Sequence, residues 1–322
     1  MPYQRSSRVG FGLAVFSAAT FGTSGALAKS LIDAGWSPAA AVTARVTIAA
    51  LVLAIPAAVM MRGRWHLLRR DAIMIAAYGL AAVAGAQLCY FNAVQHLSVG
   101  VALMLEYLGT ILVVGWMWAR HGHRPRRLTL FGAAAALAGL SLILGVFGSS
   151  HLDLVGVLFG LGAAVGLAVF FVLASGSPDD LPPVALATGG MGVGAIALLA
   201  LGGVGVLPMH ATFGLVTFAG RHVSWLIPVA CLSIVAAVIA YVAGISAARM
   251  LGPKLSSFTG LTEVIFAVLF AWLLLGQLPT GIQLAGGALI VTGIVLVRID
   301  ELRPPKTPLS EQPPADRALV PN

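Results

Sequence analysis

Four ionisable side chains stand inside long apolar stretches of the sequence: Lys29, Arg45, Glu106 and Glu263. Each would cost about 2.5–3.5 kcal/mol at the centre of a bilayer, so such residues face a helix bundle or a water-filled cavity. A carboxylate there can bind a substrate amine or carry a coupling proton, and a cation can bind a carboxylate or phosphate. The alternative is a set of buried ion pairs that fixes helix packing. The sequence leaves both interpretations open, with Glu106 the foremost candidate for substrate or proton binding.

Three further polar residues lie within the apolar stretches: Tyr90, Asn92 and Tyr241. They are candidates for lining a substrate cavity, and the alternative is simple hydrogen bonding between helices. Residues 22–25, Gly-Thr-Ser-Gly, resemble the Gly-x-Ser-Gly motif of rhomboid intramembrane proteases. A serine nucleophile needs a base within hydrogen-bond reach, and all seven histidines lie in loops or at the edges of apolar stretches. We therefore predict that the chain is not an enzyme.

Composition indicates which elements must position these residues. The chain has 322 residues, of which 9% are charged and 59% hydrophobic, and its mean hydropathy is +0.97. Soluble proteins carry about 25% charged residues, and no soluble fold of this length can bury so much apolar surface. Composition therefore excludes a soluble enzyme and a disordered chain, and it indicates a polytopic membrane protein.

The net charge of +8 does not indicate a nucleic-acid partner, because the basic residues lie in short loops between apolar runs and form no basic stripe. The two cysteines, Cys89 and Cys231, both lie inside apolar runs. We therefore expect no disulfide framework, no metal site and no cofactor.

Ten apolar runs are each long enough to cross about 30 Å of hydrocarbon as a helix. The short alternating segments of a β-barrel are absent, which predicts an all-α membrane protein. The runs lie near residues 9–32, 38–61, 71–95, 97–120, 127–148, 152–175, 182–206, 224–248, 253–276 and 280–298. The stretch from Pro208 to Arg221 is the least regular part of this pattern, and the sequence leaves open whether it forms a short interfacial helix.

The distribution of basic residues predicts the orientation. With an inside N-terminus, the inside segments hold 16 of the 19 Lys and Arg residues, the outside loops hold only Arg221, and two lie within spans. Because cytoplasmic loops are enriched in Lys and Arg, we predict a multi-pass protein of the cell (plasma or inner) membrane with both termini cytoplasmic. The proline-rich stretch 299–322 is typical of a disordered cytoplasmic tail.

The two halves of the chain resemble each other. The pattern Leu-x-Gly-x6-Gly at 130–139 recurs at 284–293, at an offset of 154 residues. In the same order, Glu106 is matched by Glu263, and Tyr90 by Tyr241. Five spans per copy is an odd number, so the copies, at 9–148 and 152–298, must have inverted topology. Inverted repeats are common in secondary transporters, whose binding site lies near the membrane midplane between the copies.

The stretch that begins Arg249-Met-Leu-Gly-Pro and closes Leu-Ala-Gly-Gly-Ala-Leu-Ile-Val-Thr-Gly293 resembles the last two helices of EamA-type transporters. These belong to the drug/metabolite transporter superfamily. The resemblance covers residues 10–298 as two EamA repeats, and Lys29 and Arg45 match polar positions that recur in the family's first two helices. It implies a transporter with a small-molecule substrate.

Residues 105–109, Leu-Glu-Tyr-Leu-Gly, and the motif His-Leu-Asp-Leu-x-Gly at 151–156 resemble the threonine and homoserine exporter branch of this family. That resemblance implies amino-acid export as one activity. Tyr107 stands where the family pattern has a proline after the glutamate.

Together these features predict a secondary transporter that exports a small polar metabolite by alternating access. Its expected partners are the bilayer, the substrate, a coupling proton and, as a homodimer, a second copy of the chain. Two alternatives stay open. A multidrug exporter would need an aromatic, acid-lined cavity, and a structural or sensory membrane protein would show no transport.

Overall fold

The computed structural model describes residues 2–121, 127–143, 153–278 and 280–302. Seven helices in this part are long and apolar enough to cross a membrane: Arg8–Asp33, Pro38–Met60, Ala72–His96, Val99–Arg120, Leu154–Ser175, Pro183–Gly203 and Leu226–Gly260. Three shorter apolar helices accompany them, at Arg127–Ala136, Thr262–Leu275 and Leu284–Gly293. The predicted boundary between the repeats, at 148–152, and residues 303–322 of the predicted tail lie outside the described residues.

The first half of the chain contains only helices among its described residues. They are α1 (Pro2–Asp33), α2 (Pro38–Met60), α3 (His66–Arg70), α4 (Ala72–Ala77), the π-helix η1 (Tyr78–Gly85), α5 (Ala86–His96), α6 (Val99–Glu106), α7 (Gly109–His121) and α8 (Arg127–Ile143). Helix α2 begins where Ser37 accepts a hydrogen bond from the Ala40 backbone amide and Pro38 takes the first helical position, an arrangement that favours helix initiation.

The second half follows a similar order with one insertion. Its elements are α9 (Leu154–Ser175), α10 (Pro183–Gly203), β1 (Leu215–Phe218), β2 (Arg221–Ser224), α11 (Leu226–Ser233), the π-helix η2 (Ile234–Ile239), α12 (Ala240–Gly260), α13 (Thr262–Leu275) and α14 (Gly281–Leu302). At Gly252, where φ is 77° and ψ 168°, the backbone of α12 is not helical. This conformation suits glycine, and it divides α12 into two helical segments.

Structural landmarks recur at a separation of 154 residues. Helix α5 begins at Ala86 and α12 at Ala240, each directly after a π-helix. The break between α6 and α7 begins at Tyr107, and the break between α12 and α13 lies at Leu261. The two halves therefore share helix interruptions as well as sequence motifs.

This register changes how the two glutamates correspond. At a separation of 154 residues, Glu106 corresponds to Gly260 and Glu263 to Gly109. The match of Glu106 with Glu263 in the sequence is therefore displaced by three residues. That match rested on residue type alone, whereas the helix breaks define the register. The two carboxylates lie on opposite sides of corresponding breaks.

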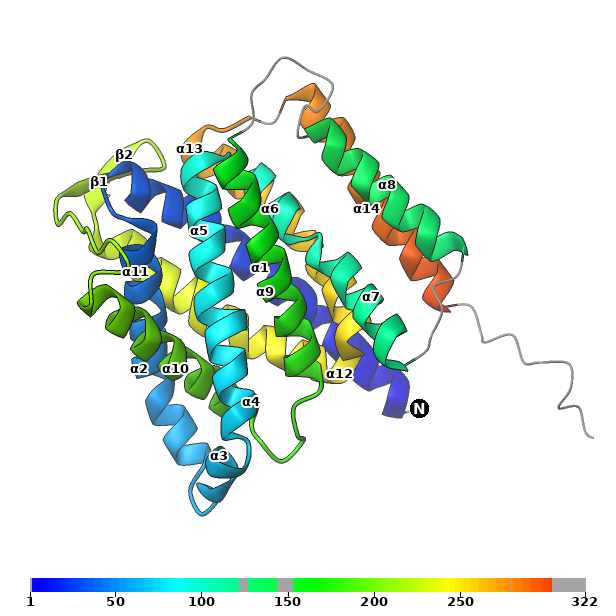
Figure 1. Ribbon diagram of the computed structural model, residues 1–322, viewed down its shortest axis with the longest axis horizontal. Coiled ribbons are helices and arrows are strands. Elements are labelled where there is room, and N and C mark those ends of the chain that lie inside the picture. The colour runs from blue at the N-terminus through cyan, green and yellow to red at the C-terminus, as the bar shows by residue number, and fades with distance from the viewer. Residues whose placement is uncertain (1, 122–126, 144–152, 279, 303–322) are drawn as a thin grey trace, which may run out of the picture.

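The sequence leaves open whether the stretch from Pro208 to Arg221 forms an interfacial helix, and the structure shows no helix there. Its second part enters an antiparallel hairpin in which Leu215 pairs with Ser224. The turn uses Ala219 and Gly220, with φ of 52° and 70°, values typical of a tight hairpin turn. The fold is thus helical with a small two-stranded sheet at one end of the bundle (Figure 1).

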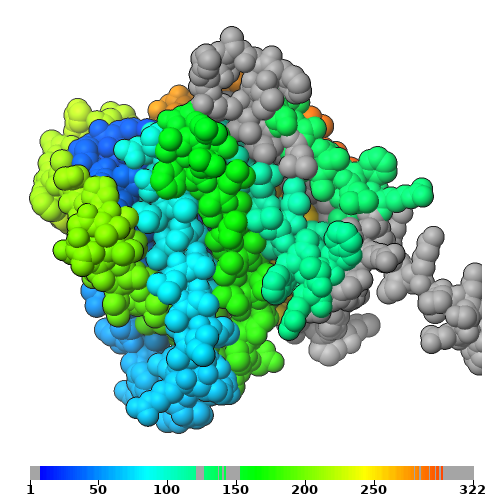
Figure 2. Space-filling model, viewed as in Figure 1, coloured from blue at the N-terminus to red at the C-terminus, as the bar shows by residue number. Residues whose placement is uncertain are grey.

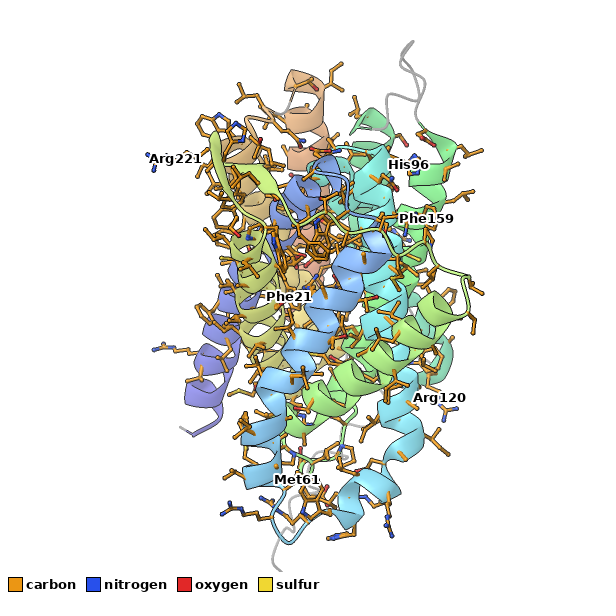
Figure 3. The ribbon with its side chains drawn as sticks, turned by 90° about the vertical axis from the view of Figure 1, so that its left-hand side faces the viewer. Phe21, Met61, His96, Arg120, Phe159 and Arg221 are labelled. Carbon is orange, nitrogen blue, oxygen red and sulfur yellow. The ribbon has the colours of Figure 1, made fainter. Side chains whose placement is uncertain are left out.

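Helices α8 and α14 pack along each other at the edge of the bundle (Figure 1). A side chain at Gly293 would collide with the backbone carbonyl of Gly132, so the small residues of the repeated motif permit this close approach. On the face shown in Figure 2, α5 and α9 lie side by side. Figure 3 shows His96 and Arg221 toward one end of the bundle, Met61 at the other, and Phe21 between them.

Candidate functional site

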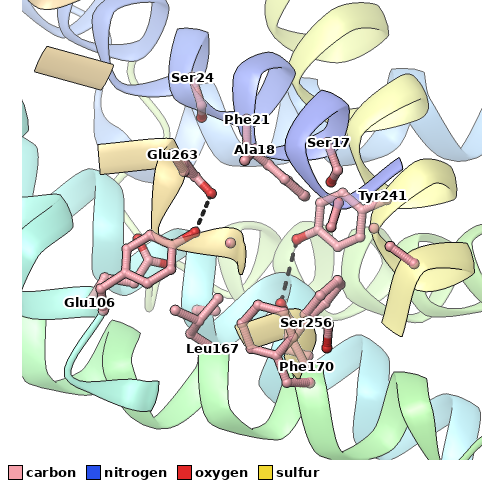
Figure 4. A pocket seen from close by; sticks show the side chains of 18 of the residues that line it. Ser17, Ala18, Phe21, Ser24, Glu106, Leu167, Phe170, Tyr241, Ser256 and Glu263 are labelled. Atoms are coloured by element: carbon pink, nitrogen blue, oxygen red, sulfur yellow. Dashed lines mark hydrogen bonds between the residues drawn. The ribbon is translucent and has the colours of Figure 1, made fainter. Parts of the chain in front are cut away.

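A cavity with about 670 Å³ of unfilled space lies among α1, η1, α5, α6, α9, α12 and α13. Its lining comes from both halves of the chain and includes the carboxylates of Glu106 and Glu263. Figure 4 shows these two residues on one side of the cavity and Tyr241 and Ser17 on the other. Small-molecule sites combine apolar walls with a few polar groups, which describes this cavity.

The helix breaks place the two carboxylates. Glu106 is the last residue of α6, and Glu263 lies in the first turn of α13. The Tyr107 hydroxyl donates a hydrogen bond of 2.6 Å to Glu263 Oε2, which joins the two breaks (Figure 4). Glu106 is 6% exposed and makes no side-chain hydrogen bond or ion pair with any residue that the structure describes. Glu106 is therefore a buried carboxylate available to a ligand.

Arg45 lies behind the cavity wall and is completely buried. Its guanidinium donates to Ser24 Oγ at 2.8 Å and to the side-chain oxygen of Gln87. It also donates to the backbone carbonyl of Ala236, and it lies 5.7 Å from the ring centroid of Phe91. No carboxylate within the described residues forms an ion pair with it. Its charge is nevertheless close enough to interact electrostatically with the cavity carboxylates.

The two π-helices each present a backbone carbonyl to the other half of the chain. Ala82 of η1 accepts a hydrogen bond of 3.4 Å from the Tyr241 hydroxyl, and Ala236 of η2 accepts from Arg45. The two alanines are 154 residues apart, so they occupy corresponding positions. A π-helix disrupts the regular hydrogen bonding of an α-helix and is frequent at functional sites. Here the Ala82 residue of η1 lines the cavity, and the Ala236 carbonyl of η2 binds Arg45 behind its wall.

Aromatic rings form much of the apolar wall. The ring centroid of Phe21 lies 5.0 Å from that of Tyr241 and 6.4 Å from that of Phe170. Phe170 lies 5.7 Å from Tyr241 and 5.1 Å from Phe171. All four pairs meet edge to face, a favourable geometry for aromatic contacts. These rings come from α1, α9 and α12 and so connect the two halves.

The structure separates the predicted site residues into two groups. Glu106, Glu263, Tyr90 and Tyr241 line the cavity, with Arg45 behind its wall. Lys29 and Asn92 lie elsewhere. Lys29 forms an ion pair of 2.9 Å with Asp33. The Asn92 side chain donates to the backbone carbonyl of Leu88 at 2.7 Å and lines a different cavity, beside Trp36 and His210.

Sequence reasoning missed four residues at the site: Tyr107, Gln87, Ser24 as a partner of Arg45, and Phe170. Two had a usable signal. Gln87 stands three residues before Tyr90, a spacing that puts both on one helix face. Tyr107 stands where the family pattern has proline, and proline could not donate the hydroxyl hydrogen bond. Among the described residues, no group of three or more His, Cys, Asp or Glu side chains could hold a metal ion.

Two ion pairs at the ends of the spans link the halves. Both guanidinium nitrogens of Arg70 bind Asp180, at 2.7 and 2.8 Å, and this contact lowers the pKa of the Asp180 carboxyl. Near the other end, Asp153 Oδ2 lies 2.6 Å from His96 Nδ1. The His96 contact, helped by backbone amides of Val155 and Gly156, lowers the pKa of Asp153.

A bundle of apolar helices around a cavity that both halves line is typical of membrane transporters. The sequence model of the EamA-like transporter family matches residues 8–145 and again residues 154–299. The chain therefore belongs to the EamA-like transporter family, within the drug/metabolite transporter superfamily, and is a multi-pass membrane protein of a transporter family rather than an enzyme family.

Two individual proteins are similar to this chain. An "Uncharacterized transporter" of Archaeoglobus fulgidus is 26% identical over 207 residues, which cover 64% of this chain and 70% of the relative. A solved structure described as "Crystal structure of protein" matches with a TM-score of 0.61 at 19% identity, over 92% of this chain and 97% of that one. The second likeness shows the fold.

Proposed function

We propose that the chain is a secondary transporter of the cytoplasmic membrane that exports a small polar metabolite by alternating access. The observation that carries this proposal is the cavity between the halves, which holds Glu106 from α6 and Glu263 from α13. A site shared by two repeats changes its exposure when one repeat rocks against the other. The Tyr107–Glu263 hydrogen bond crosses between the halves, so such a motion would break or remake it.

The proposal includes ten spans with both termini in the cytoplasm. Gly252 divides the segment Leu226–Gly260, and the shorter helices α8, α13 and α14 supply further crossings. The strong bias of Lys and Arg toward alternate loops supports this orientation. Reporter fusions at the C-terminus and in the hairpin test it: the C-terminal reporter should be active only inside the cell, and the hairpin reporter only outside.

We propose that Glu106 also carries a coupling proton, because it is buried and has no protein partner among the described residues. In proteoliposomes, Glu106→Gln should abolish transport driven by a pH gradient. Asp33→Asn is the matched control, since it removes a carboxylate outside the cavity that is paired with Lys29. A Glu106→Gln variant with the wild-type rate and pH profile would remove this role.

An amino acid is one candidate cargo, in line with the exporter-branch motifs around Glu106. The second candidate function is multidrug export, which the aromatic, acid-lined cavity favours. Growth of expressing cells on amino acids, their toxic analogues and cationic drugs separates the two. Resistance confined to amino-acid analogues supports the first, and broad drug resistance supports the second.

The decisive experiment is substrate-dependent flux in proteoliposomes that contain the purified full chain. Flux of any member of a metabolite panel supports transport. Absence of flux across the panel would favour a structural or sensory role instead. The proposed homodimer is measured on the same preparation, by light scattering of the purified protein.

A further inference from the structure

We infer that the cavity binds an organic monocation, a protonated amine with an apolar or aromatic body, in preference to the zwitterionic amino acid of the same shape. This inference rests on the proposed transport function and names the substrate class of the same cavity. Three features of the cavity carry it: the charges that face it, the hydrogen-bonding groups that remain available, and the nature of its walls.

The charges that face the cavity are negative. Glu106 and Glu263 line it, and none of the described residues that line it is Lys, Arg or His. Arg45 is sealed behind the wall, with three of its N–H groups donated to Ser24, Gln87 and Ala236. A substrate ammonium therefore meets acidic side chains directly, whereas a substrate carboxylate would be buried beside the same acids with no cation among the described lining residues.

The available hydrogen-bonding groups are mainly acceptors. Four hydroxyls of the lining already donate within the protein: Ser17 to the carbonyl of Ala240, Tyr107 to Glu263, Tyr241 to the carbonyl of Ala82, and Ser256 to the carbonyl of Gly252. Their remaining lone pairs, and those of the free Glu106 carboxylate, can only accept. An ammonium group is a pure donor, and a carboxylate is a pure acceptor. The cavity therefore complements the first, while for the second it offers only neutral donors such as the hydroxyls of Ser24 and Tyr90.

The walls suit a cation with an apolar body. Phe21, Phe170 and Tyr241 surround the cavity with their centroids 5.0–6.4 Å apart. Aromatic faces attract ammonium groups through their quadrupole, most strongly where water is excluded. The same rings bury an apolar or aromatic substituent. No comparable compensation exists for a substrate carboxylate, because none of the described lining residues is a cation and Arg45 is completely buried behind the wall.

Phenethylamine and phenylalanine test the inference, because they differ only in one carboxylate. Binding of each to the purified full chain in detergent is measured by isothermal titration calorimetry, which avoids leakage of the free amine across lipid. Phenethylamine should bind at least about tenfold more tightly than phenylalanine, the difference that one uncompensated charge contact typically makes. Equal binding, tighter binding of phenylalanine, or no binding of phenethylamine would overturn the inference.

Variants assign the effect to the cavity. Glu106→Gln should weaken phenethylamine binding by about tenfold or more, the loss expected for a charge-assisted hydrogen bond. Asp33→Asn should leave it unchanged. The comparison of the two ligands on the wild-type chain needs no variant, so it stands even where Glu106→Gln lowers stability.

Flux measurements distinguish the two proposals. If phenethylamine fails to bind while proteoliposomes transport an amino acid, transport stands and the monocation inference falls. If phenethylamine binds with the expected selectivity but no member of the panel is transported, the cavity chemistry stands and the proposed transport function falls.

Discussion

Replacing Arg45 by methionine should destabilise the protein, because the arginine donates hydrogen bonds to three buried acceptors. The side chains of Ser24 and Gln87 can turn toward the cavity when the guanidinium is lost. The carbonyl of Ala236 belongs to the backbone of η2 and cannot turn. Methionine fills similar volume but donates nothing, so this buried acceptor would lose its side-chain donor.

The size of the effect follows from these contacts. One stranded buried acceptor costs about 1–3 kcal/mol. The loss of the other two hydrogen bonds is offset in part because the guanidinium no longer has to be desolvated. We therefore expect a net decrease of about 1–3 kcal/mol in the free energy of unfolding, dominated by the Ala236 carbonyl.

Thermal unfolding in detergent, followed by tryptophan fluorescence, measures this effect. Lys29→Met is the matched control, since it removes a cation whose i,i+4 pair with Asp33 is partly exposed and worth about 0.3–0.5 kcal/mol. Arg45→Met should melt well below both wild type and this control. If Arg45→Met melts at or above the wild-type temperature, the stranded carbonyl is not costly and the reasoning is wrong, as some replacements of buried charges by apolar residues have shown.

Three further predictions concern other contacts. Tyr107→Phe removes the hydrogen bond to the Glu263 carboxylate of α13. In proteoliposomes it should change the flux by about tenfold, the scale of one hydrogen bond to a charged group. It should also shift the pH profile of that flux. Gly293→Leu should separate α8 from α14 through collision with the Gly132 carbonyl and lower the melting temperature, whereas leucine at a helical glycine with open space around it should not. Asp153 has a lowered pKa in the folded protein because of its contact with His96. Its stabilising contribution is therefore present above the ordinary carboxyl pKa and is lost as the pH falls through the lowered value. Asp153→Asn should abolish that loss in a series of melting temperatures against pH, and a variant whose melting temperature still falls at acid pH as in wild type would contradict this.

Hydropathy predicted the helices well where a single apolar run forms a single regular helix. The run at 38–61 became α2 (Pro38–Met60), and the run at 182–206 became α10 (Pro183–Gly203). It could not predict the π-helices or the break at Tyr107, because apolar composition does not report which carbonyl each amide binds. Hydropathy did not predict the hairpin at 215–224 for a related reason, since the hairpin depends on turn geometry at Ala219 and Gly220.

The candidate site was predictable in its residue types and only partly in its arrangement. The cost of charge in lipid correctly indicates that Arg45 and Glu106 face the protein interior, and both are buried. It does not decide whether a residue faces the cavity or a neighbouring helix, since that depends on rotation of each helix about its axis. Arg45 therefore lies behind the wall, and Asn92 turns to its own helix.

The asymmetry of the two carboxylates has a steric origin in the repeat. Gly260 corresponds to Glu106, and a side chain there would lie 3.1 Å from the Phe171 ring and 3.3 Å from the Tyr107 hydroxyl. Gly109 corresponds to Glu263, and a side chain there would meet the backbone of α9. Each half therefore keeps one carboxylate and packs tightly at the corresponding position.

Close packing at Gly109 and Gly260 disfavours an acid at either position, and the surroundings of Glu106 and Glu263 differ. Tyr107 occupies the space beside Gly260 and binds Glu263, so the carboxylate of the second half is held within the protein. Glu106, in the first half, has no such partner among the described residues. Because the binding carboxylate is single, the cavity should bind one ammonium group or one proton at a time. Under the proposed function, exchange of the two would need no second acidic site.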